Sequence, residues 1–364
     1  MKASIQKTNG NLNVAKLSLP SHAEYCLTAC GNNAATMNDM IRKSTKQYDA
    51  VILDRFVFAG CKHYKKFSSN VKPSDGRIVW LQGDACHDGE ILSMQGFAMS
   101  GMKVKSVVVN GRSLGFCYED EHACYCRLSG VTPANFANSN EQQTREVFES
   151  IRDALEDNGF DFTDIVRTWF YNRNILDWYA EFNSVRTEFF KKHGTFDKMV
   201  PASTGIGAAN ALGPALVTNV FAVKPKSSDV KIRAVKSPMQ GSALSYKSSF
   251  SRAVEMSFPT HWTLMISGTA SIDQEGKSVH VDDCRKQIGL TMEVVRALLE
   301  SRRMDWSDIF RGIAYFRDIS DRPLLDKYLR ENGIPEFPLA VAHTDICRKD
   351  LLFEIEADAI KVNC

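Results

Sequence analysis

The chain has 364 residues, enough for two or three domains of ordinary size, each with a hydrophobic core of its own. Hydrophobic residues make up 44% of it and charged residues 24%, which is typical of a globular protein, and the formal net charge is only +2. So balanced a charge gives no electrostatic reason to expect a nucleic acid or an anionic membrane surface as partner. The first residues lack the apolar run of a signal peptide, and no stretch approaches the ~18 apolar residues of a membrane span, so we expect a cytoplasmic protein.

The ten cysteines are scattered along a large chain without an export signal, and we expect them to be reduced thiols. Cys61 with His63, and Cys86 with His87, could each form half of a zinc site. Neither pair has the Cys-x-x-Cys spacing that is typical of structural zinc. The sequence therefore predicts neither a bound metal nor an organic cofactor.

Residues 1–104 predict an N-terminal region of mixed α and β structure. Strands are expected at 25–29, 50–58 and 77–82, and a helix at 37–46. We find no residue-level match between this region and the rest of the chain. It could be an unrelated domain or a degenerate third copy of the modules that follow it.

Residues 105–224 predict a module of order β-β-α-β-α-β. Ser139 can cap a helix whose apolar residues recur with helical spacing, and Asp157-Asn158-Gly159 can end it. The other expected elements are strands at 106–110, 114–118, 123–130, 165–171 and 215–223, and a helix at 178–193. The run Lys-Pro-Lys-Ser-Ser that follows is typical of a linker.

Residues 240–364 repeat this order of elements and part of its sequence. The block 161–167 recurs as 305–311, a shift of 144 residues, and the same shift matches Gln143 with Gln287. The expected elements are strands at 248–257, 264–270, 309–316 and 351–360, and helices at 282–301 and 322–332. The duplication predicts an α+β protein of tandem modules, each a sheet with helices on one face.

Several short motifs of the two copies point to one family. They are Ile266-Ser267-Gly268-Thr269, Gln287 at a helix entrance, and the final strand 351–357, with 128–130 and 201–204 in the first copy. Through them the chain resembles the RidA family, also called YjgF or endoribonuclease L-PSP. The resemblance implies a chorismate-mutase-like fold, trimers with ligand clefts between neighbouring modules, and hydrolysis of imines and enamines. The tandem modules could form an internal pseudo-trimer within a monomer, or could assemble as a homo-oligomer.

The chain departs from the deaminases of this family at one position. Those enzymes bind the substrate carboxylate with the arginine of a Pro-Ala-Arg motif. Here the matching residue is Ser203 in the first copy and Leu339 or Ala340 in the second. Neither copy offers a guanidinium there, which makes an imine or enamine deaminase the weaker alternative.

The segment 347–354, together with the long chain and its tandem modules, resembles the chorismatases. These enzymes hydrolyse chorismate and release pyruvate and a cyclic acid. The resemblance implies that Glu354 protonates the enol-pyruvyl group of the substrate. It also implies the residues around the substrate: Cys347 beside the acid, Thr269 and Ala270 against the ring, and Arg317 on a carboxylate.

The residues alone give Glu354 a physical basis as a general acid. Glu354 and Glu356 alternate onto one face of the final strand, and two neighbouring carboxylates raise each other's pKa. A carboxyl group that is protonated near neutral pH is what a general acid requires. Matching the final strands at a shift of 135 residues places Glu354 opposite Asn219, so only one copy would carry the acid. Both carboxylates could instead face water.

An anionic ligand needs cations, and the planar fork of arginine suits a carboxylate. Arg173 and Arg317 follow the matching middle strands and are the first candidates, with Arg186, Arg127 and Arg348 as further ones. Each could instead form a surface ion pair. Gly205, in Gly-Ile-Gly, could let backbone N–H groups approach a ligand oxygen, or could mark a turn.

These observations favour a hydrolase that acts on a small carboxylated metabolite by protonating an enol ether or enamine, with a chorismatase-like enzyme as the most specific form. We expect one working cleft, built largely on the second copy with the first as its wall. The alternative of another class is a binding protein that kept the cleft and lost catalysis.

Overall fold

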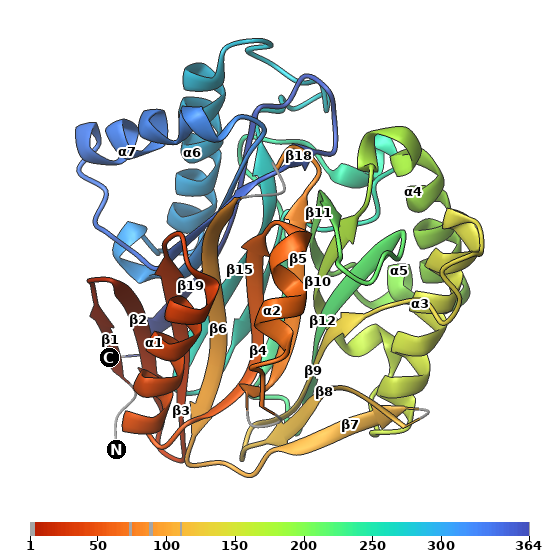
Figure 1. Ribbon diagram of the computed structural model, residues 1–364, viewed down its shortest axis with the longest axis vertical. Helices are drawn as coiled ribbons and strands as arrows, with labels where there is room; N and C mark the ends of the chain where they lie inside the picture. Colours follow the sequence, from red (N-terminus) through yellow and green to blue (C-terminus); the bar gives the residue numbers. More distant parts are fainter. Residues whose placement is uncertain (1–3, 73–74, 87–89, 110, 364) are drawn as a thin grey trace.

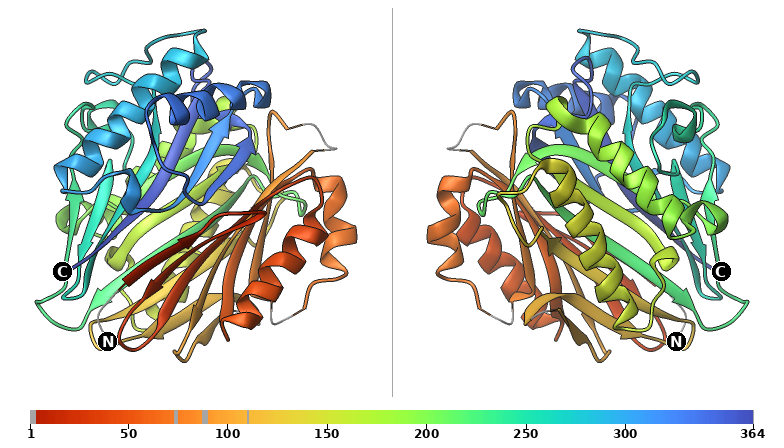
Figure 2. Two further views of the ribbon diagram at one scale, coloured as in Figure 1. Left: turned by 90° about the vertical axis from the view of Figure 1, so that its left-hand side faces the viewer. Right: turned by 90° about the vertical axis from the view of Figure 1, so that its right-hand side faces the viewer.

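The computed structural model describes residues 4–72, 75–86, 90–109 and 111–363. Three α+β units follow one another along the chain, and their helices lie on the outside while their strands converge in the middle (Figures 1 and 2). Within the described ranges, no helix is both long enough and apolar enough to cross a membrane.

Each unit has three strands, a helix, a strand, a second helix and two final strands, to which unit 2 adds a short helix and unit 3 a short strand. Unit 1 contains β1 (Ser4–Thr8), β2 (Leu12–Ser18), β3 (Ala23–Cys30), α1 (Ala34–Gln47), β4 (Val51–Ala59), α2 (Tyr64–Ser68), β5 (Arg77–Gly83) and β6 (Ile91–Ser100). Unit 2 contains β7 (Lys105–Val109), β8 (Arg112–Glu119), β9 (Ala123–Val131), α3 (Asn140–Glu156), β10 (Ile165–Asn172), α4 (Ile175–Lys192), α5 (Thr195–Lys198), β11 (Ala202–Ala209) and β12 (Leu216–Pro225). Unit 3 contains β13 (Lys231–Val235), β14 (Ala253–Ser257), β15 (His261–Ala270), α6 (Cys284–Ser301), β16 (Ile309–Phe316), α7 (Arg322–Glu331), β17 (Leu339–His343), β18 (Asp345–Ile346) and β19 (Phe353–Val362).

The three units share one strand order. Their sheets run β1-β2-β3-β6-β4-β5, β7-β8-β9-β12-β10-β11 and β13-β14-β15-β19-β16-β17, so the N-terminal region has the topology of the two copies. Each middle strand also has a register shift at the same place, before Asp54, Arg167 and Arg311. This shared irregularity gives the residue-level match that the sequence lacks. The α+β fold with three similar units in one chain agrees with the predicted internal pseudo-trimer.

The repeated sequence block has a structural cause. Asp161 and Asp164 form a capping box around a short 3-10 turn, and Asp305 and Asp308 form the same box. Each box satisfies backbone N–H groups where the chain enters the middle strand. Each strand is buried along its whole length, which explains its β-branched and aromatic residues.

The helices cover the outer faces of the sheets. In α3, Ser139 caps the helix by accepting a hydrogen bond from the Gln142 N–H, as predicted, and the residues at helical spacing are buried against the unit 2 sheet. The inner faces of the sheets share a second core, to which all three units contribute Phe56, Phe58, Trp169, Tyr171, Ile313 and Tyr315 among others. The units are therefore held together by apolar packing as well as by strand pairing.

The sequence analysis missed several strands. A turn was one of the expectations for Gly205, but this residue lies within the strand β11. β11 also pairs with β5 and so joins the sheets of units 1 and 2. Small residues are needed here because neighbours approach closely: a Cβ at Gly205 would lie 3.3 Å from the Tyr179 hydroxyl oxygen. Unit 3 begins with β13 at Lys231, ahead of the expected position 240.

The two pairs considered as halves of a zinc site were Cys61 with His63 and Cys86 with His87. Within the described parts of the chain, no three His, Cys, Asp or Glu side chains lie together as metal ligands would. His87, one member of the pairs considered, lies outside the described residues.

Candidate active site

A cavity lies between units 2 and 3, where β11 packs against β15. The Ser203 N–H donates to the Ser267 hydroxyl oxygen (2.8 Å), and the Gly268 N–H donates to the Thr204 hydroxyl oxygen (3.0 Å). The cavity spans about 510 Å³ of space not filled by atoms, part of which is open to solvent. Its lining comes from unit 2 (Tyr179, Arg186, Ser203, Gly205), from the segment before β14 (Tyr246, Ser248, Phe250, Arg252) and from unit 3 (Gly268, Ala270, Ile272, Cys347, Arg348, Glu354).

Glu354 lies on β19 at the inner wall of this cavity, with only 4% of its surface exposed. It pairs in register with Ala270 of β15 and Tyr315 of β16. The carboxyl group lies against Gly268: a Cβ there would be 3.0 Å from the Glu354 Cδ and would overlap Oε1. A glycine at position 268 is therefore a condition for the observed position of the acid.

The environment keeps Glu354 protonated at neutral pH. Burial and the nearby charge of Glu356 raise its pKa to about 8, against the weaker opposing effect of Arg167 and Arg252. No side chain in the described ranges donates a hydrogen bond that would stabilise the ionised form. A buried carboxyl group of this kind can donate a proton.

Glu356, two residues along the same strand, has the opposite environment. Arg167 and Arg311 donate to its two oxygens at 2.9 and 2.6 Å, and the Trp169 indole N–H donates at 2.8 Å. Although burial acts in the other direction, these guanidinium groups lower the pKa of Glu356. The pair thus contains one protonated and one ionised carboxyl group. From the strand alternation we had expected each carboxylate to raise the pKa of the other.

Three arginines line the cavity, and two of them have free donor groups. Arg186 and Arg252 are buried (1% and 5% exposed), and Nε of Arg186 and one Nη of Arg252 have no hydrogen-bond partner among the described residues. Arg348 is anchored by its bond to the Gly276 carbonyl oxygen (2.7 Å). Guanidinium groups in the lining of a cavity are suited to bind an anionic group of a ligand.

Tyr179 and Tyr246 supply hydroxyl groups to the cavity, and Cys347 lies beside the acid. Burial, then the nearby Glu354 charge, raises the pKa of the Cys347 thiol to about 12. The thiol is therefore not ionised at neutral pH and lacks the character of a nucleophile. His343, four residues before it, contacts Glu90 through Nδ1 (2.7 Å) and the Arg317 carbonyl oxygen through Nε2 (3.1 Å).

Four of the predicted site residues line this one cavity: Glu354, Cys347, Ala270 and Gly205. Thr269 lies behind the wall, where its hydroxyl donates to the Ser267 carbonyl oxygen at 2.8 Å. Two further side chains, Arg186 and Arg348, were secondary candidates in the sequence. No sequence pattern pointed to Tyr179 or to Arg252 as residues of the site. Arg252 lies in an irregular segment that was expected to be a strand.

The first two arginine candidates are not in the cavity. Arg317 donates to the Arg348 carbonyl oxygen (2.7 Å) and pairs with Asp345 (3.1 Å), so it holds the loop before β19. Arg173 is exposed; its backbone N–H donates to the Ala215 carbonyl oxygen, and its carbonyl oxygen accepts from the Trp178 indole N–H (2.8 Å). Both lie directly after the middle strands, as predicted, whereas the arginines that line the cavity of Glu354 come from α4, from the segment before β14 and from the loop before β19.

The register of the copies also needs correction. β10 pairs Trp169 with Asn219, and β16 pairs the equivalent Ile313 with Glu356, so Asn219 corresponds to Glu356 and the shift is 137 residues, not 135. A slip of two residues preserves strand alternation, so the apolar pattern could not reveal the error. The same pairings make Ser203 equivalent to Leu339, not Ala340.

With the corrected register, the equivalents of Glu354 are Val217 in unit 2 and Ser93 in unit 1. Val217 lines the corresponding cleft between units 1 and 2. Ser93 donates to the Val341 carbonyl oxygen (2.7 Å), where unit 3 meets unit 1. Among the three equivalent positions, one carries an acid.

The comparisons with known proteins agree with this architecture. The family model of endoribonuclease L-PSP matches residues 125–218. A chorismatase of Streptomyces rapamycinicus is 28% identical over 238 residues, 58% of this chain and 68% of the relative, and a 3-hydroxybenzoate synthase of Streptomyces hygroscopicus is 24% identical over 242 residues, 59% and 68% respectively. A crystal structure of a chorismatase superposes with a TM-score of 0.66 at 19% identity and covers 94% of this chain and 100% of its own.

The tandem units and the inter-unit cavity define a RidA-like protein. Within that class the chain is chorismatase-like, since the likeness in fold covers all three units.

Proposed function

We propose that the protein is a chorismatase-like hydrolase that cleaves chorismate to pyruvate and a cyclic acid, with Glu354 as the general acid. The observation that carries the proposal is the buried Glu354 carboxyl group in a cavity that Arg186, Arg252 and Arg348 also line. The equivalent positions in the other two units carry Val217 and Ser93, which cannot donate a proton in this way.

The reaction follows from the protonation state of Glu354. Its O–H transfers the proton to the methylene carbon of the enol-pyruvyl group, which leaves a positive charge shared by the ether carbon and the ether oxygen. Water adds to that carbon, and the ionised Glu354 takes back a proton from the added water, which gives a hemiketal. As the hemiketal collapses, its hydroxyl group loses a proton and becomes the carbonyl group of pyruvate. The bond between the carbon and the ring oxygen breaks, the ring oxygen takes up that proton, and pyruvate leaves. The anionic Glu356, held close behind the acid, stabilises the positive charge that develops.

The substrate's two carboxylates require cations. Arg186 and Arg252 are buried and approach the cavity from α4 and from the segment before β14. The Tyr179, Ser203 and Ser248 hydroxyl groups can bind the ring oxygens. Buried donors that stay unpartnered without an anion favour a ligand that supplies one.

Pyruvate release from chorismate tests the proposal. We expect the wild type to release pyruvate, and Glu354→Gln, which keeps the shape but has no transferable proton, to lose at least 10²-fold in kcat. Glu336→Gln, on an exposed residue, is the matched control. Pyruvate release by Glu354→Gln at the wild-type rate would exclude the assigned role.

The arginines can be tested as a set. Arg186→Met and Arg252→Met are each expected to raise KM at least tenfold, about 1.4 kcal/mol of lost ligand binding. Arg173→Met removes an exposed arginine outside the cavity and should leave KM unchanged. If chorismate binds in an Arg252-dependent manner and yields no pyruvate, the protein is a binding protein with this cleft.

A further inference from the structure

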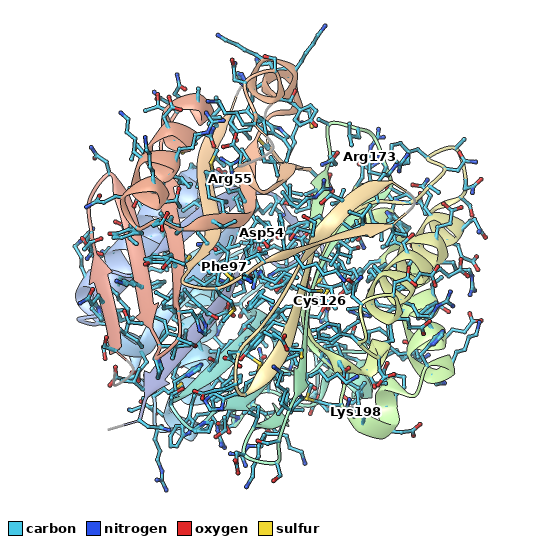
Figure 3. All side chains as sticks on the ribbon, turned by 90° about the horizontal axis from the view of Figure 1, so that it is seen from below. Asp54, Arg55, Phe97, Cys126, Arg173 and Lys198 are labelled. Carbon is cyan, nitrogen blue, oxygen red and sulfur yellow. The ribbon has the colours of Figure 1, made fainter. Side chains whose placement is uncertain are left out.

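A second cavity lies where the three sheets meet, apart from the candidate active site. It encloses about 750 Å³ of space not filled by atoms and shares no lining residue with the cavity of Glu354. Figure 3, which views the molecule from below, shows two of its residues, Asp54 and Phe97, near the centre of the molecule. Units 1, 2 and 3 all contribute to its wall. We refer to it as the axial cavity.

Arg127 is a cation of this cavity with free donors. It is 9% exposed, and its guanidinium lies 4.0 Å from the ring centre of Phe97 and 5.1 Å from that of Phe221. Its Nε donates to Asp54 (3.2 Å), and within the described ranges this is the one hydrogen bond of its side chain. The residue belongs to the lining of the cavity, and a guanidinium group can bind a carboxylate with two parallel hydrogen bonds.

The other charges of the axial cavity are nearly balanced. Arg311 donates to Asp358 and to Glu356 (both 2.6 Å), and Glu356 is shared with Arg167. Glu24, a half-buried residue of the lining, lies 3.6 Å from His22 and also interacts electrostatically with His261. A ligand with only a negative charge would be repelled by the carboxylates of the wall, and a ligand with only a positive charge would be repelled by Arg127. A zwitterion leaves the balance unchanged, with its carboxylate at Arg127 and its ammonium group at Glu24.

The rest of the lining is apolar and largely aromatic. Its large members are Phe56, Tyr125, Met256, Phe258, Met265 and Phe310. Such a wall favours an apolar body with a flat ring, because aromatic groups gain both burial and ring–ring contacts. We infer that the axial cavity binds a small zwitterion of the amino-acid type with an aromatic side chain, at a site separate from the catalytic one.

Calorimetric titration of the full chain with three related probes tests this inference. L-Phenylalanine carries both charges, 3-phenylpropionate only the carboxylate and phenethylamine only the ammonium group. We expect L-phenylalanine to bind at least tenfold more tightly than either analogue. Arg127→Met should weaken L-phenylalanine at least tenfold and leave phenethylamine nearly unchanged. No binding of L-phenylalanine by the folded wild type would overturn the inference.

A second variant keeps the test valid if Arg127→Met does not fold. Thr263 lines the axial cavity from β15 and is not part of the ion pairs, so Thr263→Phe should fill the space and abolish binding. Wild-type affinity in this variant would place the probe elsewhere and refute the site. Glu354→Gln should bind L-phenylalanine as the wild type does, which makes the result independent of the proposed hydrolysis.

Discussion

Glu354→Gln is expected to stabilise the protein while it removes activity. In the folded state the pKa of Glu354 is raised from its usual 4.5 to about 8, so between these values the unfolded chain releases a proton that the folded chain retains. Each pH unit in this interval lowers the free energy of unfolding by about 1.4 kcal/mol. At pH 7 the glutamate side chain therefore lowers the free energy of unfolding by about 3 kcal/mol, whereas a glutamine has no such effect.

The sign of the effect gives a clear assay. The stability advantage of Glu354→Gln should be near zero below pH 4.5, grow as pH rises from 4.5 to 8, and stay constant above 8. Urea unfolding followed by tryptophan fluorescence at pH 5, 7 and 8 measures it, with Glu336→Gln as the exposed control. An advantage that is the same at pH 5 and pH 8 would refute the claim that folded Glu354 retains its proton.

The remaining predictions concern its neighbours. Glu356→Gln should destabilise the protein by about 3–5 kcal/mol in the same urea assay, because Arg167 and Arg311 lose a buried counter-charge; a loss below 1 kcal/mol would contradict this. Gly268→Ala should lower kcat for pyruvate release about 10²-fold by displacing the Glu354 carboxyl group, whereas Gly10→Ala, with open space around it, should not. The kcat/KM for chorismate should be flat below pH 8 and fall about tenfold per pH unit above it, as the acid loses its proton; a rise with pH would mean that Glu354 acts as a base.

The sequence was informative where local rules determine the structure. Ser139 capped its helix as predicted, and the repeated aspartates marked the entrance to two equivalent strands. The α+β fold and the likeness to RidA-like and chorismatase-like proteins were also predicted correctly. The sequence of unit 1 could not be matched with those of the other two units, because the topology depends on which positions are buried. Different residues can fill those positions.

The site was harder to predict because its parts are distant in the sequence. Arg186 and Arg252 reach the cavity through the packing of α4 and an irregular segment against unit 3, which no local pattern encodes. Glu356 was expected to raise the pKa of its neighbour, and it does so as a permanently ionised group, because arginines of units 2 and 3 meet around it.

Because the three similar units belong to one chain, each unit can carry residues that the other two lack. In an assembly of identical subunits, every substitution appears three times, so each subunit would carry the cost of about 3 kcal/mol at pH 7 that an acid with the burial of Glu354 brings. Here that cost falls on one position, while Val217 and Ser93 make conventional apolar or hydrogen-bonded contacts. A single chain can thus place the acid in one cleft and leave the equivalent positions of the other two units to packing.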